Sequence, residues 1–406
     1  MQRAQTSLCW PIFLVTALAA TQLVYAQTAK KPFDVIVKTV DNDGVGGQLQ
    51  GLSLRDGLIL HTSDNDEQHI PTHDLVSITQ PKTNVPTRTR DVTLTLVRGD
   101  FLHGRLIDGD DEAVTIETVD LGRLSIPLEM ICGIDSAQAH LPAYKASTVW
   151  FHRSAGGQED QILLTNGDVV RGFVTAIDAK GVSIESSLGE TTIPHTLALA
   201  VRLISPPPQV LDRPYMAVTF HNSGRMTVTN LNWSGSVVEA ELPQGQRAAI
   251  EAERVVRIDV TGGRWEWLSQ HQPISYQHTP MLSMDWDYVA DRNVLGEPII
   301  VDSETFEHGI GVHSRSSLTY DLKGIYTQFV TSFGMDDNSG PYADVSVAIL
   351  VDGKLRFDHE HAVRGQLVGP IRLDVTKAKR VELVADFGEN GDLQDRFNWI
   401  EPALVR

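Results

Sequence analysis

The stretch SLTYDLKGIYTQFVTSFGMDDNSGPYADVSVAILV, residues 317–351, decides the fold class of this chain. It holds three short runs that are rich in β-branched and aromatic residues and partly alternate in polarity, as strands do: 317–322, 328–333 and 344–351. The segment GMDDNSG at 334–340 supplies the glycine and Asx side chains that turns favour. Two further runs follow at 371–375 and 380–385. We therefore expect an antiparallel two-sheet sandwich with functional loops gathered at one end.

Short motifs follow one another in a fixed order through the same part of the chain. They are LSMDW (282–286), GIGVH (309–313), YDL (320–322), GMDD (334–337), VDGK (351–354), DVTKA (374–378), Asp395 and Trp399. By their order and spacing, residues 280–405 resemble the NPCBM family of carbohydrate-binding modules, which often accompany glycoside hydrolases. The resemblance implies a galactose-binding-like β-sandwich, or jelly roll, that binds galactose-like or related glycans. The family's usual ending, Asp-His-x-Asp-Trp, reads DRFNW at 395–399 here, so Arg396 and Asn398 depart from it.

Loop residues of a few chemical types are the candidates for sugar contacts. Proteins hold sugars with aromatic faces and with planar amide, carboxylate or guanidinium groups. The residues predicted to bind carbohydrate are His313, Arg315, Asp336, Asp337, Asn338, Asp395, Asn398 and Trp399. Two of them have a structural alternative, because Trp399 could lie in the core and His313 could be a buried histidine with a satisfied ring. Trp286 is expected to anchor the first strand of the module.

The pair Asp336 and Asp337 also fits a structural Ca²⁺ site, because hard cations take several carboxylate and carbonyl oxygens. The chain lacks the regular Ca²⁺ loop pattern, so turn formation is the alternative for these two residues. The sequence contains no Gly-x-Ser-x-Gly elbow, His-Glu-x-x-His motif or phosphate loop. Acid pairs such as Glu304 and Glu307 are expected at the surface rather than as the two carboxylates of a glycosidase. No catalytic residue is therefore predicted.

Four copies of one β unit precede this module, at residues 33–80, 91–138, 159–205 and 215–262. In the two clearest copies a strand leads to a Gly-Asp turn and then to a glycine inside the next strand, Gly104 or Gly172, where we expect a bend or bulge. The fourth copy has Thr229 at that place. Each copy closes with two apolar residues eight apart: Ile70/Ile78, Ile126/Ile134, Ile193/Val201 and Ile250/Ile258.

Bent strands of this length suit small five-stranded barrels, and the repeat loosely resembles Sm-like or SH3-like barrels. The predicted fold class is therefore all-β, with tandem small β-barrel-like repeats followed by a galactose-binding-like sandwich at residues 263–406. The repeats are expected to act as spacers or as docking modules for envelope proteins.

Residues 1–26 have the features of a secretory signal peptide. Arg3 precedes an apolar stretch at 10–20, and VYA at 24–26 is a small-residue cleavage pattern. The apolar stretch is shorter than the roughly 20 residues that a membrane helix needs. We expect cleavage, no membrane span afterwards, and a secreted protein that is extracellular or periplasmic. Only Cys132 would remain, which excludes an internal disulfide.

The formal net charge of −18 disfavours phosphate-rich partners. No stripe of Lys and Arg with interleaved aromatic residues exists to bind nucleic acid. The sequence thus predicts a secreted, non-catalytic protein whose partner is a glycan or polysaccharide. The alternative is a structural or protein-interaction component of the cell envelope without sugar binding. A secreted glycoside hydrolase, or an accessory of one, is the least favoured interpretation.

Overall fold

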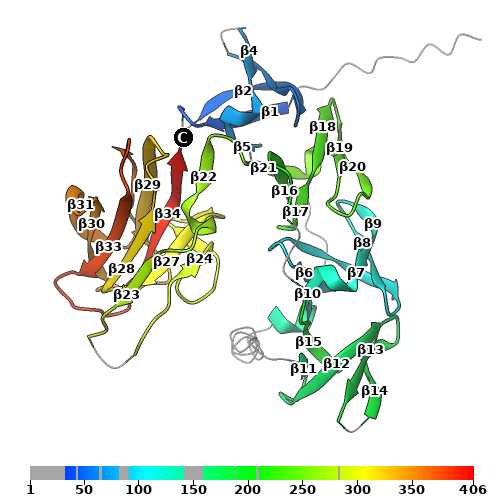
Figure 1. Ribbon diagram of the computed structural model, residues 1–406. Coiled ribbons are helices and arrows are strands. Elements are labelled where there is room, and N and C mark those ends of the chain that lie inside the picture. Colours follow the sequence, from blue (N-terminus) through cyan, green and yellow to red (C-terminus); the bar gives the residue numbers. More distant parts are fainter. Residues whose placement is uncertain are drawn as a thin grey trace, which may run out of the picture. The chain divides into compact units, whose positions relative to one another are not determined.

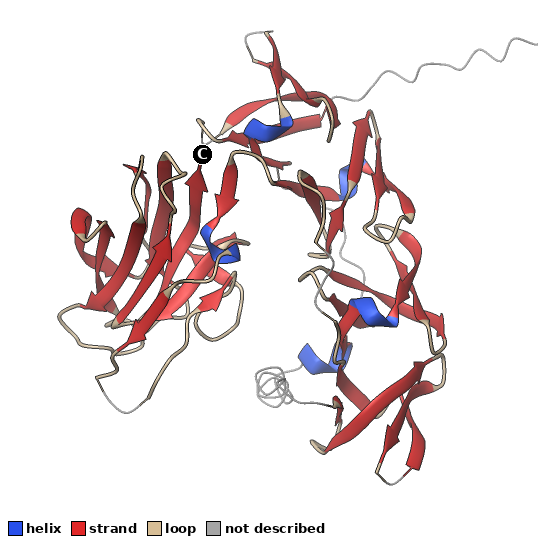
Figure 2. Cartoon of the chain, in the orientation of Figure 1, coloured by secondary structure: helices blue, strands red, loops and turns tan. Residues whose placement is uncertain are grey.

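The computed structural model describes residues 33–42, 44–63, 66–81, 91–140, 159–187, 189–206, 210–281 and 284–406. The predicted signal peptide at 1–26 lies outside these ranges. Nearly all regular structure in them is antiparallel strand, which confirms the all-β fold class (Figure 1, Figure 2). The helices in these ranges are single 3₁₀ turns. No helix in the described part of the chain has the length and apolar character that a membrane crossing requires.

The first repeat contains five strands and one helical turn: β1 (Phe33–Thr39), β2 (Val45–Ser53), β3 (Gly57–Thr62), β4 (Glu67–Ile70), η1 (Thr72–Asp74) and β5 (Leu75–Thr79). Strands β1 to β4 form a meander, and β5 returns to pair with β1. Phe33, Val35 and Val37 alternate with exposed or half-buried residues along β1 and point into the core.

The second and third repeats follow the same order. Their elements are β6 (Val92–Leu96), β7 (Phe101–Gly109), β8 (Ala113–Thr118), β9 (Gly122–Pro127), η2 (Leu128–Met130), β10 (Ile131–Ser136) and η3 (Ala137–His140), then β11 (Asp160–Leu164), β12 (Val169–Ile177), β13 (Gly181–Ser186), β14 (Gly189–Pro194) and β15 (Ala198–Arg202). In each, the last strand pairs with the first.

The fourth repeat differs in its second strand, which is divided in two at Thr229. Its elements are β16 (Tyr215–Phe220), β17 (Arg225–Val228), β18 (Asn230–Ser234), β19 (Val237–Glu241), β20 (Arg247–Glu251), η4 (Ala252–Arg254) and β21 (Val255–Thr261). In β7 and β12 the equivalent place is held by glycine, and the strand continues through it. A residue with a Cβ therefore coincides with a break where glycine allows a continuous bent strand.

Gly104 and Gly172 lie against the neighbouring strand. A Cβ added to either residue would come 2.4 Å (Gly104) or 2.1 Å (Gly172) from a backbone carbonyl oxygen. The pairing register of each strand shifts shortly afterwards, between Leu106 and Asp108 in β7 and between Val174 and Ala176 in β12. These shifts confirm the predicted bulges, and the close backbone approach explains why glycine precedes them.

The expected small barrels do not close. Within the described ranges, no pairing joins the fourth and fifth strands of any repeat. Instead the fifth strands pair across repeats, β5 with β21 and β10 with β15. The free N–H and C=O groups of one sheet edge are thereby satisfied by another copy. The repeats consequently form one 21-stranded hydrogen-bonded sheet and share one hydrophobic cluster.

The carboxy-terminal part is a sandwich of two sheets. One sheet has the order β24 (Val289–Ala290), β27 (Gly309–His313), β34 (Arg396–Val405), β29 (Gln328–Met335) and β32 (Leu367–Asp374), with β22 (Trp265–Trp267) paired to β34. The other has the order β23 (Ser275–His278), β28 (Ser316–Asp321), β33 (Arg380–Phe387), β30 (Asp344–Val351) and β31 (Lys354–Val363). A small hairpin joins β25 (Ile299–Val301) to β26 (Glu304–Phe306), and η5 (Leu268–Gln270) follows β22.

The sandwich core is aromatic at its centre. Phe333 meets Phe397 and Trp399 with ring centroids 5.7 Å and 6.0 Å away, and all three rings are buried. Residues from both sheets complete this cluster. A separate cluster joins Trp265 and Trp267 of β22 to Val40 and Val76 of the first repeat. The sandwich thus has its own core and a second apolar contact with the repeats.

Candidate functional site

Loops and strand ends that are distant in the sequence meet at one end of the sandwich (Figure 1). Strand β27 ends at His313 opposite Arg396, where β34 begins. In the other sheet, β28 begins at Ser316 opposite His278, where β23 ends. The segments 279–281, 284–288, 336–343 and 388–395 lie between strands at this same end, which we call the loop end. Every residue predicted to bind carbohydrate lies in or beside it, except that Trp399 lies inside β34.

Trp286 is a partly exposed aromatic side chain of the loop end. Its ring stacks face to face on His313, with ring centroids 5.0 Å apart and an interplanar angle of 5°. His278 supports the pair from its edge and accepts the Trp286 backbone N–H through Nδ1 at 3.3 Å. Trp286 is half-buried, so part of the indole remains available to a ligand. Sequence reasoning gave this residue only an anchoring role.

His313 positions the Trp286 ring. It is buried, and its Nδ1 lies 3.0 Å from the Ser314 carbonyl oxygen. Burial lowers the pKa of His313, so the ring is neutral at pH 7 and Nδ1–H donates that hydrogen bond. His313 is therefore a buried histidine, as the alternative interpretation expected. It contacts the Trp286 indole and is not itself open to solvent.

Arg315 is an exposed cation of the loop end. Its side chain is 55% exposed and its Nε lies 3.2 Å from Asp386 Oδ1. Tyr342, which is 65% exposed, and Asn390 lie in neighbouring loops, and the Asn390 amide donates to the Tyr342 carbonyl oxygen at 3.1 Å. Tyr342 was missed by sequence reasoning, although an aromatic residue directly after the GMDDNSGP segment is a signal that could have found it.

Asp336 and Asn398 form the buried floor of the loop end. Asp336 is 2% exposed and accepts hydrogen bonds from the side-chain amides of Asn398 at 3.1 Å and Asn293 at 3.3 Å. Burial raises the pKa of Asp336 above its ordinary value. Both predicted residues therefore hold loops together, and neither presents a polar group to solvent.

Asp337 and Asn338 connect this floor to the β25–β26 hairpin. The Asp337 carboxylate accepts the backbone N–H groups of Asp302 at 3.0 Å and Ser303 at 2.9 Å, two residues with positive φ. Asn338 accepts from the Arg396 guanidinium through both its backbone and side-chain oxygens. These two predicted residues are half-buried, and their polar groups are largely used within the protein.

Asp395 lies under the loops between the two sheets. It is 1% exposed and accepts the Ser314 hydroxyl at 2.6 Å and the Asp344 backbone N–H at 3.2 Å. Burial raises the pKa of Asp395 to about 6, and the nearby Asp344 carboxylate adds to this rise. Asp344 also pairs with His361, at 3.1 Å, and the bond raises the pKa of that histidine.

Trp399 does not reach the loop end. Its ring is fully buried between Phe333 and Phe397, and it offers no face to solvent. Alternation in β34 explains this, since Trp399 lies two residues from Phe397 and shares its inward face. The structure therefore places this predicted contact residue in the core.

The predicted Ca²⁺ ligands Asp336 and Asp337 do not converge. The Asp336 oxygens face Asn293, Asn398 and backbone N–H groups, whereas those of Asp337 face the β25–β26 hairpin. Within the described residues, three carboxylate or imidazole groups come together elsewhere, at Asp259, Glu307 and His308. A cation at Asp336 and Asp337 stays a prediction, and N–H donors already occupy the oxygens that it would need.

Strand β22 pairs with β34 and so belongs to the sandwich. The family comparison assigns the same boundary to this domain. Residues 264–405 match the NPCBM/NEW2 domain. The match supports a carbohydrate-binding module in this part of the chain and confirms the resemblance found in the motifs. It begins at β22, which precedes the first motif recognised in the sequence.

Solved structures of carbohydrate-binding modules are similar to the chain. CBM51 from Clostridium perfringens GH95 in complex with methyl-galactose is 21% identical over 35% of this chain and 99% of that one, with a TM-score of 0.32. CBM51-2 in complex with GlcNAc and INT domains from Clostridium perfringens ZmpB is 20% identical over 47% and 43%, with a TM-score of 0.30. The tandem CBM51 modules of Sp3GH98 from Streptococcus pneumoniae SP3-BS71 are 11% identical over 60% and 87%, with a TM-score of 0.31. No curated protein matches the chain.

Proposed function

We propose that this chain is a secreted, non-catalytic carbohydrate-binding protein whose loop end binds galactose-like or related glycans. The observation that carries the proposal is the Trp286 ring, which is partly exposed to solvent and held flat on the buried His313. An aromatic face held in a fixed orientation is suited to the apolar face of a pyranose ring. The match of residues 264–405 to a carbohydrate-binding domain family supports the same ligand class.

Other polar groups of the loop end would fix the orientation of a bound sugar. Arg315 and Asp386 form an exposed ion pair, and Asp392 lies close enough to His313 to affect its pKa. Guanidinium and carboxylate groups pair with adjacent hydroxyls, and this geometry distinguishes one epimer from another. A shallow site of this kind has few buried atoms, so we expect a Kd on the order of millimolar to micromolar.

The test is titration calorimetry of the full chain with methyl-galactoside and GlcNAc, followed by a glycan array. Trp286→Ala should weaken sugar binding on the order of tenfold or more, because it removes the stacking face. Phe173→Ala is the matched control, since Phe173 is an exposed aromatic residue of β12, 58% exposed, and outside the sandwich. Sugar binding that is equal in the two variants, or no sugar retained on the array, would overturn the proposal.

One observation favours a second function, a structural or protein-interaction component of the cell envelope. Most polar groups predicted for sugar contact already bond within the protein, as Asp336, Asp337 and Asn398 do. In that case the repeats would supply the docking surface, and the sandwich would keep its fold without a sugar ligand. Glycan binding by the wild-type chain that Trp286→Ala abolishes would exclude this function for the loop end.

A further inference from the structure

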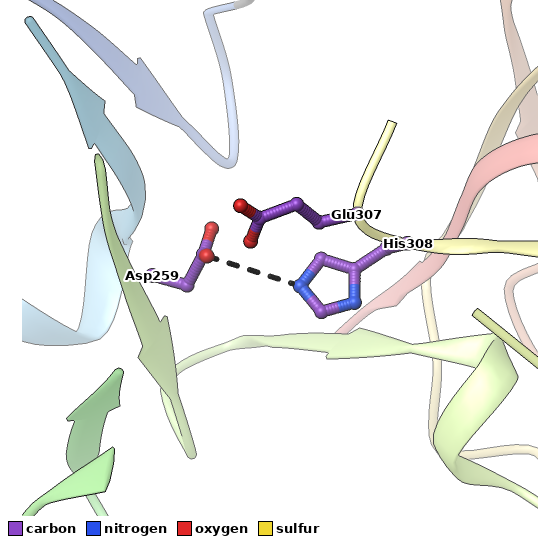
Figure 3. Close-up of side chains that lie close together, drawn as sticks. All are labelled: Asp259, Glu307 and His308. Carbon is purple, nitrogen blue, oxygen red and sulfur yellow. Dashed lines mark ion pairs between the residues drawn. The ribbon is translucent and has the colours of Figure 1, made fainter. Parts of the chain in front are cut away.

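Three ionisable side chains converge away from the loop end, beside the junction of the fourth repeat and the sandwich (Figure 3). Asp259 comes from β21, and Glu307 and His308 directly precede β27. One oxygen or nitrogen atom of each lies within 4.8 Å of the others. Asp259 is 1% and His308 4% exposed, and Glu307 is half-buried. This arrangement corrects the expectation that Glu307 belongs to an acid pair at the surface.

Buried polar atoms of Asp259 and His308 lack hydrogen-bond partners among the described residues, whereas Glu307 Oε2 accepts the Thr219 hydroxyl at 3.3 Å. Asp259 Oδ2 and His308 Nε2 are buried and have none, and His308 Nδ1 lies within ion-pair distance of Asp291 without a well-aligned hydrogen bond. Asp259 Oδ2 and His308 Nε2 are 4.0 Å apart, which is too far for a hydrogen bond. Unpaired buried polar atoms are costly, and their occurrence in one cluster points to a missing partner between them.

Neighbouring groups orient the two buried side chains toward the space between them. His308 stacks on Trp267, with ring centroids 4.5 Å apart, and its Nδ1 lies 3.4 Å from Asp291 Oδ1. Asp259 uses its other oxygen, Oδ1, to accept the Arg257 Nε–H at 2.7 Å. A histidine with a carboxylate behind one nitrogen and the other nitrogen facing a second carboxylate is the usual arrangement around a protein-bound metal ion.

The charged side chains around His308 favour a bound cation. The carboxylates that interact with His308 are Asp259, Asp291, Glu307 and Glu401, and the cations that interact with these carboxylates are Lys38, Arg225 and Arg257. The carboxylates outnumber the cations, and this excess favours a bound metal cation. Repulsion from Arg257 and Arg225 opposes cation binding, but Arg257 also pairs with Glu401 at 3.4 Å and Arg225 with Asp100 at 3.6 Å.

We propose that Asp259, Glu307 and His308 bind a first-row divalent cation, for which Zn²⁺ is the probe. One imidazole and two carboxylates, without thiolate, suit such ions. Zn²⁺ bonds of about 2.0–2.2 Å place two ligands of one ion roughly 3–4 Å apart, so the groups must close by about 1 Å. Because the ligands come from β21 and from the segment before β27, the ion would cross-link the fourth repeat to the sandwich.

The experiment uses the full chain after treatment with chelator. Titration calorimetry with ZnCl₂ should give one tight site per chain, and Zn²⁺ should raise the melting temperature. Glu307→Gln keeps the side-chain shape at a half-buried position, so it should fold and lose at least tenfold in Zn²⁺ affinity. His308→Ala should lose the site entirely. His61→Ala is the matched control, because His61 also pairs with a glutamate, Glu67 at 2.9 Å, but at the surface.

Each result decides the proposal. Affinity lost in Glu307→Gln and kept in His61→Ala supports it, even if His308→Ala fails to fold. Affinity that Glu307→Gln retains would place the ion elsewhere and overturn it. A wild-type chain that binds no Zn²⁺, or whose melting temperature Zn²⁺ leaves unchanged, would also overturn it and identify the cluster as a metal-free ion-pair network.

Discussion

The four repeats and the sandwich are both built from antiparallel strands, but they use those strands differently. In the repeats, the fifth strands pair with one another, so sheet edges join the copies and one hydrophobic cluster runs through all four. In the sandwich, two sheets enclose an aromatic core of their own, and long loops meet at one end. Backbone pairing between strands thus joins the repeats to one another, whereas the sandwich brings side chains from several loops together at one end.

The largest effect should come from the sandwich core. Trp399→Ala removes a fully buried ring and should lower the free energy of unfolding by about 3–5 kcal/mol. Differential scanning calorimetry tests the comparison directly, because a separate sandwich core predicts a shift of the sandwich transition with a smaller shift for the repeats. Equal shifts throughout would show that the two regions unfold as one unit.

A smaller effect is expected in the repeats, where bent strands need glycine. Gly172→Ala places a Cβ 2.1 Å from a carbonyl oxygen and should cost about 1–3 kcal/mol through strain and backbone shifts. Gly46→Ala in β2 is the control, because no atom lies within 4 Å of its added Cβ. Denaturant unfolding measures both changes. Similar stabilities for the two variants would mean that the bulge tolerates a side chain.

The smallest effect concerns pH. Burial raises the pKa of Asp395 to about 6, so the folded state takes up a proton at a higher pH than the unfolded state does. The unfavourable contribution of Asp395 is fully present above pH 6 and decreases progressively as the pH falls from about 6 toward the ordinary pKa of 3.8. The stability of wild type relative to Asp395→Asn should therefore increase by about 1 kcal/mol from pH 7 to pH 5. A pH-independent difference would contradict the raised pKa.

Local patterns in the sequence predicted the strands well. The run at 344–351 coincides with β30, and the runs at 328–333 and 380–385 lie within β29 and β33. The residues of these strands alternate in polarity or are β-branched, and turn segments lie at the ends of the strands. Neighbouring residues are therefore enough to indicate a strand. The register shifts that follow Gly104 and Gly172 were predictable for the same reason, since a glycine inside a strand is a local signal.

Features that depend on distant pairing were not predictable. Nothing in the residues of β5 or β21 indicates that they pair across more than 170 positions, and so the expected closed barrels were wrong. The same holds for Asp259 and His308, which the sequence separates and the fold brings together. Trp399 illustrates a different limit, because a motif identifies a residue without telling which face of the strand carries it.

The pairing of fifth strands has a consequence for how the amino-terminal half could grow. The last strand of the first copy pairs with that of the fourth, and the last strand of the second with that of the third, so these partners are nested. The pairing of Arg225 in β17 with Phe101 in β7 additionally links the fourth copy to the second. A single duplicated copy would leave one strand edge without a partner. Lengthening this half while keeping every last strand paired in the same way would require copies to be added two at a time.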